Sequence, residues 1–398
     1  MKKGKKMEFK RLIIGVMSIS LLTGCQSVEK MSNVQEETEE VEIEDKNLEQ
    51  EEIKELATHI EENTSQQYPL GSDVRGGVGE EAKEISEQGL SKELIVSYWF
   101  NEETDFKGFE KVADEIMEEG KNPGLGVRTL HQKGITGEGV NVAIIDQPLK
   151  LNHPEYKGKI VEYKDLCEGE GGESSMHGPA VTSILVGETI GVAPEANVYY
   201  VSAPSWTRDA AYQAEALKCI IEWNKALPME QKIHVVSVSA APSGQGSPFN
   251  KNNNQWDEAV QLANEEGILV LDCTNTYGKI APCYYDEKDR EDGSQYIIGF
   301  SKSDGNLYFD KSMVFAPVSY RTTAETYEKG SYSYQYMGTG GLSWAIPYAA
   351  GTLALGWQVN PELTGEEAMK LLSETATINQ EGYRIINPLA FVEAAQAK

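Results

Sequence analysis

The sequence predicts an α/β fold, a doubly wound and mostly parallel sheet with helices on both faces. After residue 120, short apolar runs alternate with helical segments, which is typical of this class. The runs are continuously apolar and rich in β-branched residues, as strands covered on both faces are. Several runs end in a single polar residue, at the strand ends where such sheets place their sites.

The first 24 residues are predicted to be a signal peptide, outside the fold. Six basic residues precede the apolar stretch 12–22, which is too short to span a bilayer. It ends in Leu22-Thr23-Gly24-Cys25, which resembles the lipobox of bacterial lipoproteins. The resemblance implies cleavage before Cys25, lipidation of its thiol and stable anchoring at the extracytoplasmic face of the cell membrane. An ordinary secretory signal with a chance cysteine is the alternative.

Residues 25–90 are predicted to be an acidic, disordered tether. Residues 36–62 contain thirteen acidic and two basic side chains. Such a segment buries too little apolar surface to fold alone, and its charges repel one another. The whole chain has a net charge of −27 and no basic patch, which argues against a nucleic-acid partner.

Residues 91–398 are predicted to form one large domain. It opens with an expected strand at 94–100 and an expected helix at 106–119. These two elements together cover residues 91–121.

The cysteine pattern does not predict a zinc site, because it contains no C-x-x-C pair. An exported domain permits disulfides, and a Cys273–Cys283 bridge would close a short loop. Cys219 lies in a helical apolar run and fits a free buried thiol. The pairing of these three residues and Cys167 stays open.

The expected elements after residue 128 follow the strand–helix alternation. The strands are 139–146, 197–202, 233–239 and 267–275, and the helices begin at 177, at about 210 and just after Ser343. Four residues end or begin these elements: Asp146, His177, Asn275 and Ser343. Together they supply what acyl transfer needs, since an imidazole can activate a serine hydroxyl, a carboxylate can orient the imidazole, and an amide can meet the oxyanion.

Several ordered motifs resemble the subtilisin-like serine proteases, whose triad runs Asp, His, Ser along the chain. The resemblance extends from about Asn122 to the C-terminus. The motifs are Val142-Ala143-Ile144-Ile145-Asp146, Asn152-His153-Pro154, His177-Gly178, Gly191-Val192-Ala193-Pro194, Val235-Val236-Ser237-Val238-Ser239, Phe315-Ala316-Pro317 and Gly341-Leu342-Ser343-Trp344-Ala345-Ile346-Pro347.

The resemblance implies a role for each matching residue. Ser343 is the expected nucleophile, His177 the general base and then acid, Asp146 its orienting carboxylate, and Asn275 an oxyanion donor. The implied substrate-binding residues come from two strand ends: Ser237, Val238 and Ser239 on one, and Asp272, Cys273 and Thr274 on the other. The expected partner is therefore a peptide or protein substrate. By the same resemblance, residues 91–121 are either the remnant of a propeptide or part of the catalytic domain, and self-cleavage near Asn122 would release the enzyme from its lipid anchor.

The chain also departs from the family pattern. Gln147 and Pro148 follow the aspartate, Pro179 follows His177-Gly178, and Leu342 stands where relatives carry a hydroxyl that assists the oxyanion. Loss of one such donor typically costs on the order of 10²–10³ in turnover, so slower catalysis is expected and inactivity does not follow from this change. The loop between His177 and Gly191 is short, so we do not predict the calcium site found there in some relatives. No cofactor is expected, and structural calcium elsewhere stays open.

Asp272 raises a hypothesis about specificity, because a carboxylate in the side-chain pocket would select a basic residue before the cut. The alternative is an internal ion pair with a lysine or arginine.

Three functional hypotheses follow. The leading one is a lipid-anchored, extracytoplasmic serine endopeptidase. The second is a weak or inactive pseudoprotease that still binds peptides, motivated by Pro179 and Leu342. The third is a lipoprotein that only binds a ligand, which gives no reason for Asp, His, Asn and Ser to occupy these four element ends.

Overall fold

The computed structural model describes residues 68–76, 84–85, 89–168, 176–240, 242, 247–273, 279–285, 289–298, 309–326 and 332–398. The predicted lipidation residue Cys25 lies outside these residues, as do Thr274 and Asn275. Within them, no helix is both long enough and apolar enough to cross a membrane.

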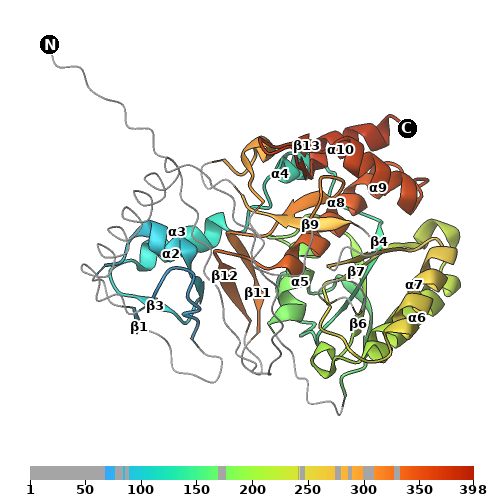
Figure 1. Cartoon of the computed structure of the whole chain (residues 1–398), viewed down its shortest axis with the longest axis horizontal. Helices are drawn as coiled ribbons and strands as arrows, with labels where there is room; N and C mark the ends of the chain where they lie inside the picture. Colours follow the sequence, from blue (N-terminus) through green and yellow to red (C-terminus); the bar gives the residue numbers. More distant parts are fainter. Residues whose placement is uncertain are drawn as a thin grey trace, which may run out of the picture.

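The largest sheet of the described residues has five parallel strands in the order β5-β6-β4-β7-β8, of which Figure 1 labels β4, β6 and β7. This confirms the predicted α/β class, and four of its strands lie within the ranges expected from the sequence. The strands are β4 (Asn141–Asp146), β5 (Ile160–Asp165), β6 (Asn197–Ser202), β7 (Ile233–Val238) and β8 (Leu269–Asp272). All are parallel to their neighbours, so their carboxyl ends share one edge.

Helices cover both faces of this sheet. Helices α6 (Ala210–Ala226) and α7 (Asn253–Glu265) pack together on one face. Helices α5 (His177–Val186) and α8 (Ala345–Val359) lie on the other. Helix α8 is apolar all round and almost entirely buried, as a helix in the middle of a domain is.

Alternate residues of β4 face these two layers. Val142 and Ile144 belong to the core that contains α5 and α8, whereas Ala143 and Ile145 belong to the core that contains α6 and α7. Successive side chains of a strand point to opposite faces, so Asp146 has the parity of Ile144. The end of β4 therefore presents its carboxylate to the α5–α8 side.

A second sheet, in the order β13-β14-β10-β9, packs beside α8. Its strands are β9 (Ile280–Cys283), β10 (Val314–Pro317), β13 (Thr377–Ile378) and β14 (Arg384–Ile385). The helices α4 (Val127–Gln132), α9 (Gly365–Glu374) and α10 (Pro388–Gln396) complete this part of the chain. Thr364 and Glu367 begin α9 with a reciprocal capping box.

Residues 68–76, 84–85 and 89–120 form a small N-terminal module at one end of the molecule (Figure 1). The boundary predicted between a tether and a domain at residue 90 is therefore wrong, because Val74 and Ile85 are buried in the core of this module. Its elements are β1 (Glu84–Ile85), α2 (Lys92–Ser97), β2 (Trp99–Asn101), β3 (Asp105–Phe106) and α3 (Glu110–Glu119). Strand β2 extends the antiparallel hairpin of β11 (Arg321–Glu325) and β12 (Ser333–Met337) into a three-stranded sheet. The module therefore shares a sheet with residues far along the chain.

The expected strand at 94–100 is wrong over most of its length, because residues 92–97 are helical. Ser91 caps this helix by accepting a hydrogen bond from Leu94 N–H at 3.2 Å. Leu94, Ile95 and Tyr98 are buried together, and their spacing matches one face of a helix. The helix expected at 106–119 is confirmed in its C-terminal part as α3.

The four described cysteines, Cys167, Cys219, Cys273 and Cys283, form no disulfide with one another. The suggested Cys273–Cys283 bridge is therefore absent. Cys219 is a half-buried thiol on α6, as its helical setting suggested.

Candidate active site

Asp146 ends β4 as a buried carboxylate at the carboxyl edge of the sheet. Its side chain is fully shielded from solvent. Its Oδ1 accepts a hydrogen bond from Gln147 N–H at 2.8 Å, while its Oδ2 has no hydrogen-bond partner within the described part of the chain. A buried carboxylate that is only partly satisfied depends strongly on any further donor.

His177 supplies that donor as the first residue of α5. Its Nδ1 donates to Asp146 Oδ1 at 2.6 Å, and its side chain is 22% exposed. This bond fixes the neutral tautomer with Nε2 free of its proton, the form that a general base needs. Burial lowers the pKa of His177, but the charge of Asp146 and its hydrogen bond raise it, and the net shift is upward.

Gly178 allows the helix to come this close to the strand end. A Cβ at this position would lie 2.5 Å from Gln147 O, 2.9 Å from Pro148 O and 2.8 Å from the Tyr200 hydroxyl. Tyr200 in turn donates to Gln147 O. Burial, and then the charge of Asp146, raise the pKa of Tyr200, so the phenol stays a donor. A glycine after His177 is therefore a steric requirement of this contact.

Ser343 lies in the single 3₁₀ turn η5 (Leu342–Trp344), directly before α8. This confirms the placement predicted from the sequence, with Pro347 in the first turn of α8. The turn η5 packs against α5, the helix that begins with His177. The nucleophile candidate and the Asp146–His177 pair are therefore carried by elements in contact.

The end of β7 is tied to the Ser343 turn by hydrogen bonds in both directions. Ser239 Oγ donates to Ser343 O at 2.8 Å, and Ser343 Oγ donates a long bond of 3.4 Å to Ser239 O. Cys273 Sγ donates to the same carbonyl at 2.8 Å. The ends of β7 and β8 and the serine turn thus meet at one backbone oxygen.

Strand alternation separates the predicted substrate-binding residues. Ser237 and Ser239 lie on the same face of the strand as Val235, which packs on the α5–α8 side. Val238 lies on the opposite face, toward α6 and α7. Cys273 contacts the α5–α8 core. Asp272 is fully buried and has the parity of Val270, which faces α6 and α7. This orientation does not favour Asp272 as the floor of a pocket beside Ser343.

Two predicted site residues, Asn275 and Thr274, lie outside the described residues. Their roles as oxyanion donor and pocket residue stay predictions. Within the residues that the structure describes, no group of three or more His, Cys, Asp or Glu side chains could hold a metal ion.

Comparisons with known proteins find similarity to one protease family. Residues 137–278, which include Asp146 and His177, match the model of the subtilase family, Peptidase S8. This match and the relatives below show that the chain is similar to the subtilisin-like S8 proteases.

The subtilase relatives are distant and cover the chain in part. The serine protease AprX of Bacillus subtilis is 27% identical over 276 residues, which are 60% of this chain and 61% of AprX. Subtilisin BL of Lederbergia lenta is 25% identical over 62% of this chain and 87% of its own length. The major intracellular serine protease of Bacillus subtilis is 27% identical, and the chain spans 43% of its length.

Solved structures show the same fold. The prenylagaramide maturation protease PagA superposes with a TM-score of 0.50 at 17% identity, over 69% of this chain and 99% of PagA. The subtilase cytotoxin SubAB gives a TM-score of 0.52 at 15% identity, over 69% of this chain and 95% of that chain. The fold is therefore that of the subtilases.

Sequence reasoning missed two supports of the site, the tyrosine at 200 and the steric need for Gly178. The His-Gly motif contained the glycine, but its reason appears only when α5 meets the loop after β4. Tyr200 lies inside an ordinary apolar strand, and no local signal marks its contact with Gln147.

Proposed function

We propose that this chain is a serine endopeptidase that hydrolyses peptide bonds through Asp146, His177 and Ser343. The hydrogen bond between His177 Nδ1 and Asp146 Oδ1, beside the turn that carries Ser343, is the observation on which the proposal rests. The subtilase relatives support a serine-type endopeptidase.

In the proposed first step, Ser343 Oγ attacks the substrate carbonyl carbon while His177 Nε2 takes the hydroxyl proton. Asp146 stabilises the imidazolium that forms. The negative oxygen of the tetrahedral intermediate is held by the Ser343 N–H and, by the family resemblance, Asn275.

The intermediate collapses by breaking the C–N bond, and the leaving amine receives the proton from His177. Water then attacks the acyl-enzyme, with His177 again taking a proton. The carboxylic acid leaves and Ser343 regains its hydrogen.

Fluorophosphonate labelling tests this proposal directly, because the probe reacts with activated serines. The chain from Gln26 onward is compared with its Ser343→Ala and His177→Ala variants. We expect labelling of the wild type alone. A folded wild-type protein that resists the probe, and cleaves no casein, would point instead to a pseudoprotease that only binds peptides.

We further propose that Cys25 carries the lipid that tethers the enzyme outside the cell, with the residues between Cys25 and the N-terminal module, which begins at residue 68, as the spacer. The lipobox-like sequence and the acidic stretch support this proposal. Growth with an alkyne fatty acid tests it: the full chain should incorporate the label in the membrane fraction, and Cys25→Ala should not. An unlabelled full-length protein in the medium would contradict lipid anchoring.

A further inference from the structure

The N-terminal module is hydrogen-bonded to the strand that leads into the Ser343 turn. In the β2–β12 pairing, Asn101 faces Gln335, Phe100 faces Tyr336 and Trp99 faces Met337. Beyond the strand, Gly338 N–H donates to Tyr98 O at 2.9 Å. Ser343 follows five residues later, so the module contacts the segment that delivers the nucleophile.

Glycines make this approach possible. A Cβ at Gly338 would lie 2.3 Å from Val96 O in the module. Gly340 has a φ of +65°, and its Cβ would lie 1.8 Å from Val318 O. The segment that leads into η5 therefore packs against the module at Gly338 and against residue Val318, outside the module, at Gly340.

The hairpin β11–β12 also contacts the helix of the general base. Ala324 N–H in β11 donates to Ser183 Oγ in α5 at 3.0 Å. On the side of the module, Thr322 N–H donates to Gly120 O at 3.0 Å. The hairpin therefore lies between the module and α5, and it joins both to the serine turn.

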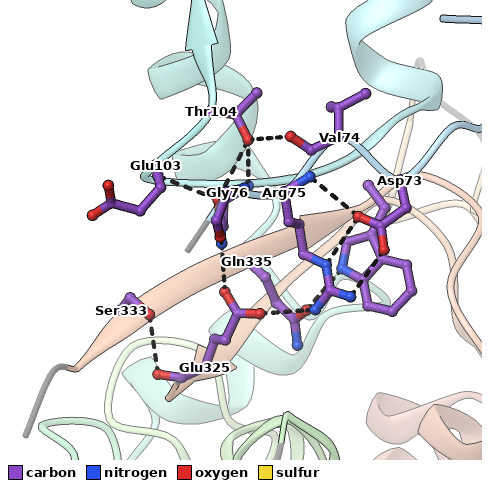
Figure 2. Close-up of polar contacts among 11 residues, drawn as sticks. Asp73, Val74, Arg75, Gly76, Glu103, Thr104, Glu325, Ser333 and Gln335 are labelled. Atoms are coloured by element: carbon purple, nitrogen blue, oxygen red, sulfur yellow. Dashed lines mark hydrogen bonds and ion pairs between the residues drawn. The ribbon is translucent and has the colours of Figure 1, made fainter. Parts of the chain in front are cut away.

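Arg75 is a charged link between the module and the hairpin (Figure 2). Its Nη1 donates to Glu325 Oε1 at 2.8 Å and to Gln335 Oε1 at 3.2 Å. Its Nε and Nη2 donate to the two carboxylate oxygens of Asp73, at 3.1 and 2.9 Å. The guanidinium carbon lies 3.5 Å from the centroid of the Trp99 ring. One planar group thus satisfies two carboxylates and stacks on an aromatic ring.

Glu325 makes this link costly to break. Its side chain has no exposed surface, and Asn101 Nδ2 donates to its Oε2 at 3.0 Å. Arg75, with 11% of its side chain exposed, provides the opposite charge. Without Arg75, an ionised carboxylate would be buried at the end of β11 with only an amide donor shown beside it.

The segment that joins the module to the rest of the chain is also buried. Residues 123–127 are buried. Pro123 O accepts from the Tyr285 hydroxyl at 2.6 Å, and Leu125 N–H donates to Arg290 O at 3.0 Å. A peptide bond must be extended and accessible to be cut, so this segment is a poor site for self-cleavage.

We propose that the N-terminal module stays with the working enzyme and positions Ser343 through β12, with Arg75 and Glu325 as positioning residues. This inference rests on the proposed protease function. It replaces release by cleavage near Asn122 with retention, and makes the module a support of the active site.

The test uses Arg75→Met and Arg75→Lys in the chain from Gln26 onward. We expect Arg75→Met to lower the rate of fluorophosphonate labelling roughly 10- to 100-fold, mostly in the chemical step with little change in probe binding. The labelling rate of Arg75→Lys should lie between those of the wild type and Arg75→Met, because an ammonium keeps the charge but lacks the planar fork of five donors. Adding Glu325→Gln to Arg75→Met should restore part of the rate, since the buried charge is then removed.

Hydrogen exchange gives a readout that needs no reactive serine. Arg75→Met should speed exchange in peptides covering 333–343 and leave α6 unchanged. The matched control is Lys225→Met, which breaks the exposed Lys225–Glu222 pair on α6. It should alter neither labelling nor exchange near Ser343.

The outcomes separate the two proposals. If Arg75→Met were labelled at the same rate as the wild type and exchanged hydrogen at the same rate in 333–343, the positioning role would be overturned. Mass spectrometry of native, probe-labelled protein should find module peptides, and labelled enzyme beginning near residue 122 without them would overturn retention. A wild type that never reacts with the probe would defeat the protease function, while the exchange experiment would still decide whether the module holds the 338–343 segment.

Discussion

Two buried carboxylates in this molecule have opposite kinds of partner. Asp146 and Glu325 both have side chains without exposed surface. Asp146 is bonded to His177, a base that titrates near neutral pH. Glu325 is bonded to Arg75, whose charge is permanent.

The difference shows how one kind of interaction serves two purposes. A carboxylate beside an imidazole can stabilise a proton that arrives and leaves, which is what acid–base catalysis requires. A carboxylate beside a guanidinium exchanges no proton, so its effect is limited to holding two parts of the chain together. The predictions below are given in order of decreasing effect on catalysis, and Asp146→Asn and Arg75→Met each break one of the two pairs.

Asp146→Asn should have the largest effect, lowering kcat on the order of 10⁴-fold at neutral pH because the amide no longer fixes the required tautomer of His177. The pH profile gives a second readout. Activity of the wild type should rise with pH through a midpoint above the ordinary histidine pKa, since Asp146 raises the pKa of His177. In Asp146→Asn the midpoint should move to lower pH. An unchanged midpoint would show that Asp146 does not govern this titration.

Gly178→Ala should lower kcat roughly 100-fold with the fold intact, because the new methyl group pushes α5 away from the loop after Asp146. Steady-state kinetics and circular dichroism measure the two effects. Full activity would mean that the helix and the loop can separate without disturbing His177.

Arg75→Met should lower the free energy of unfolding by about 3 kcal/mol at neutral pH, as the breaking of a buried ion pair does. Burial raises the pKa of Glu325, with a smaller contribution from Asp73, while Asn101 and Arg75 lower it. The net shift is upward, so the stability that this carboxyl contributes is lost as pH rises through its folded-state pKa.

Removing Arg75 raises that pKa further. Urea unfolding should therefore show that the free energy of unfolding lost in Arg75→Met becomes smaller toward acidic pH. Lys225→Met, which loses an exposed ion pair, is the control. If the loss of free energy of unfolding did not depend on pH, it would come from the lost packing on Trp99 and not from the buried charge.

Asp272→Asn should have the smallest effect on catalysis. Since Asp272 has the parity of the residues facing α6 and α7, the preference between arginine and phenylalanine before the cut should stay within about twofold. Paired peptide substrates measure it. A marked loss of arginine cleavage would instead support the pocket hypothesis.

The sequence by itself determined the α/β class, most strand and helix positions, and the placement of Asp146, His177 and Ser343 at element ends. These features are local: apolar periodicity defines the elements, and glycines and prolines mark where they stop. The prediction of a strand at 94–100 was wrong because the apolar residues there fit both the two-residue repeat of a strand and the 3.6-residue repeat of a helix. The helix forms because Ser91 caps it and because its apolar face is buried in the module's own core.

Only the tertiary structure decided which distant residues meet. Arg75 and Glu325 are 250 positions apart, and neither lies in a motif. The same holds for the clash that makes Gly178 necessary and for the face on which Asp272 lies. A local pattern states how a segment folds, whereas burial of a charge depends on the surfaces brought against it, and those are fixed only when the whole chain packs.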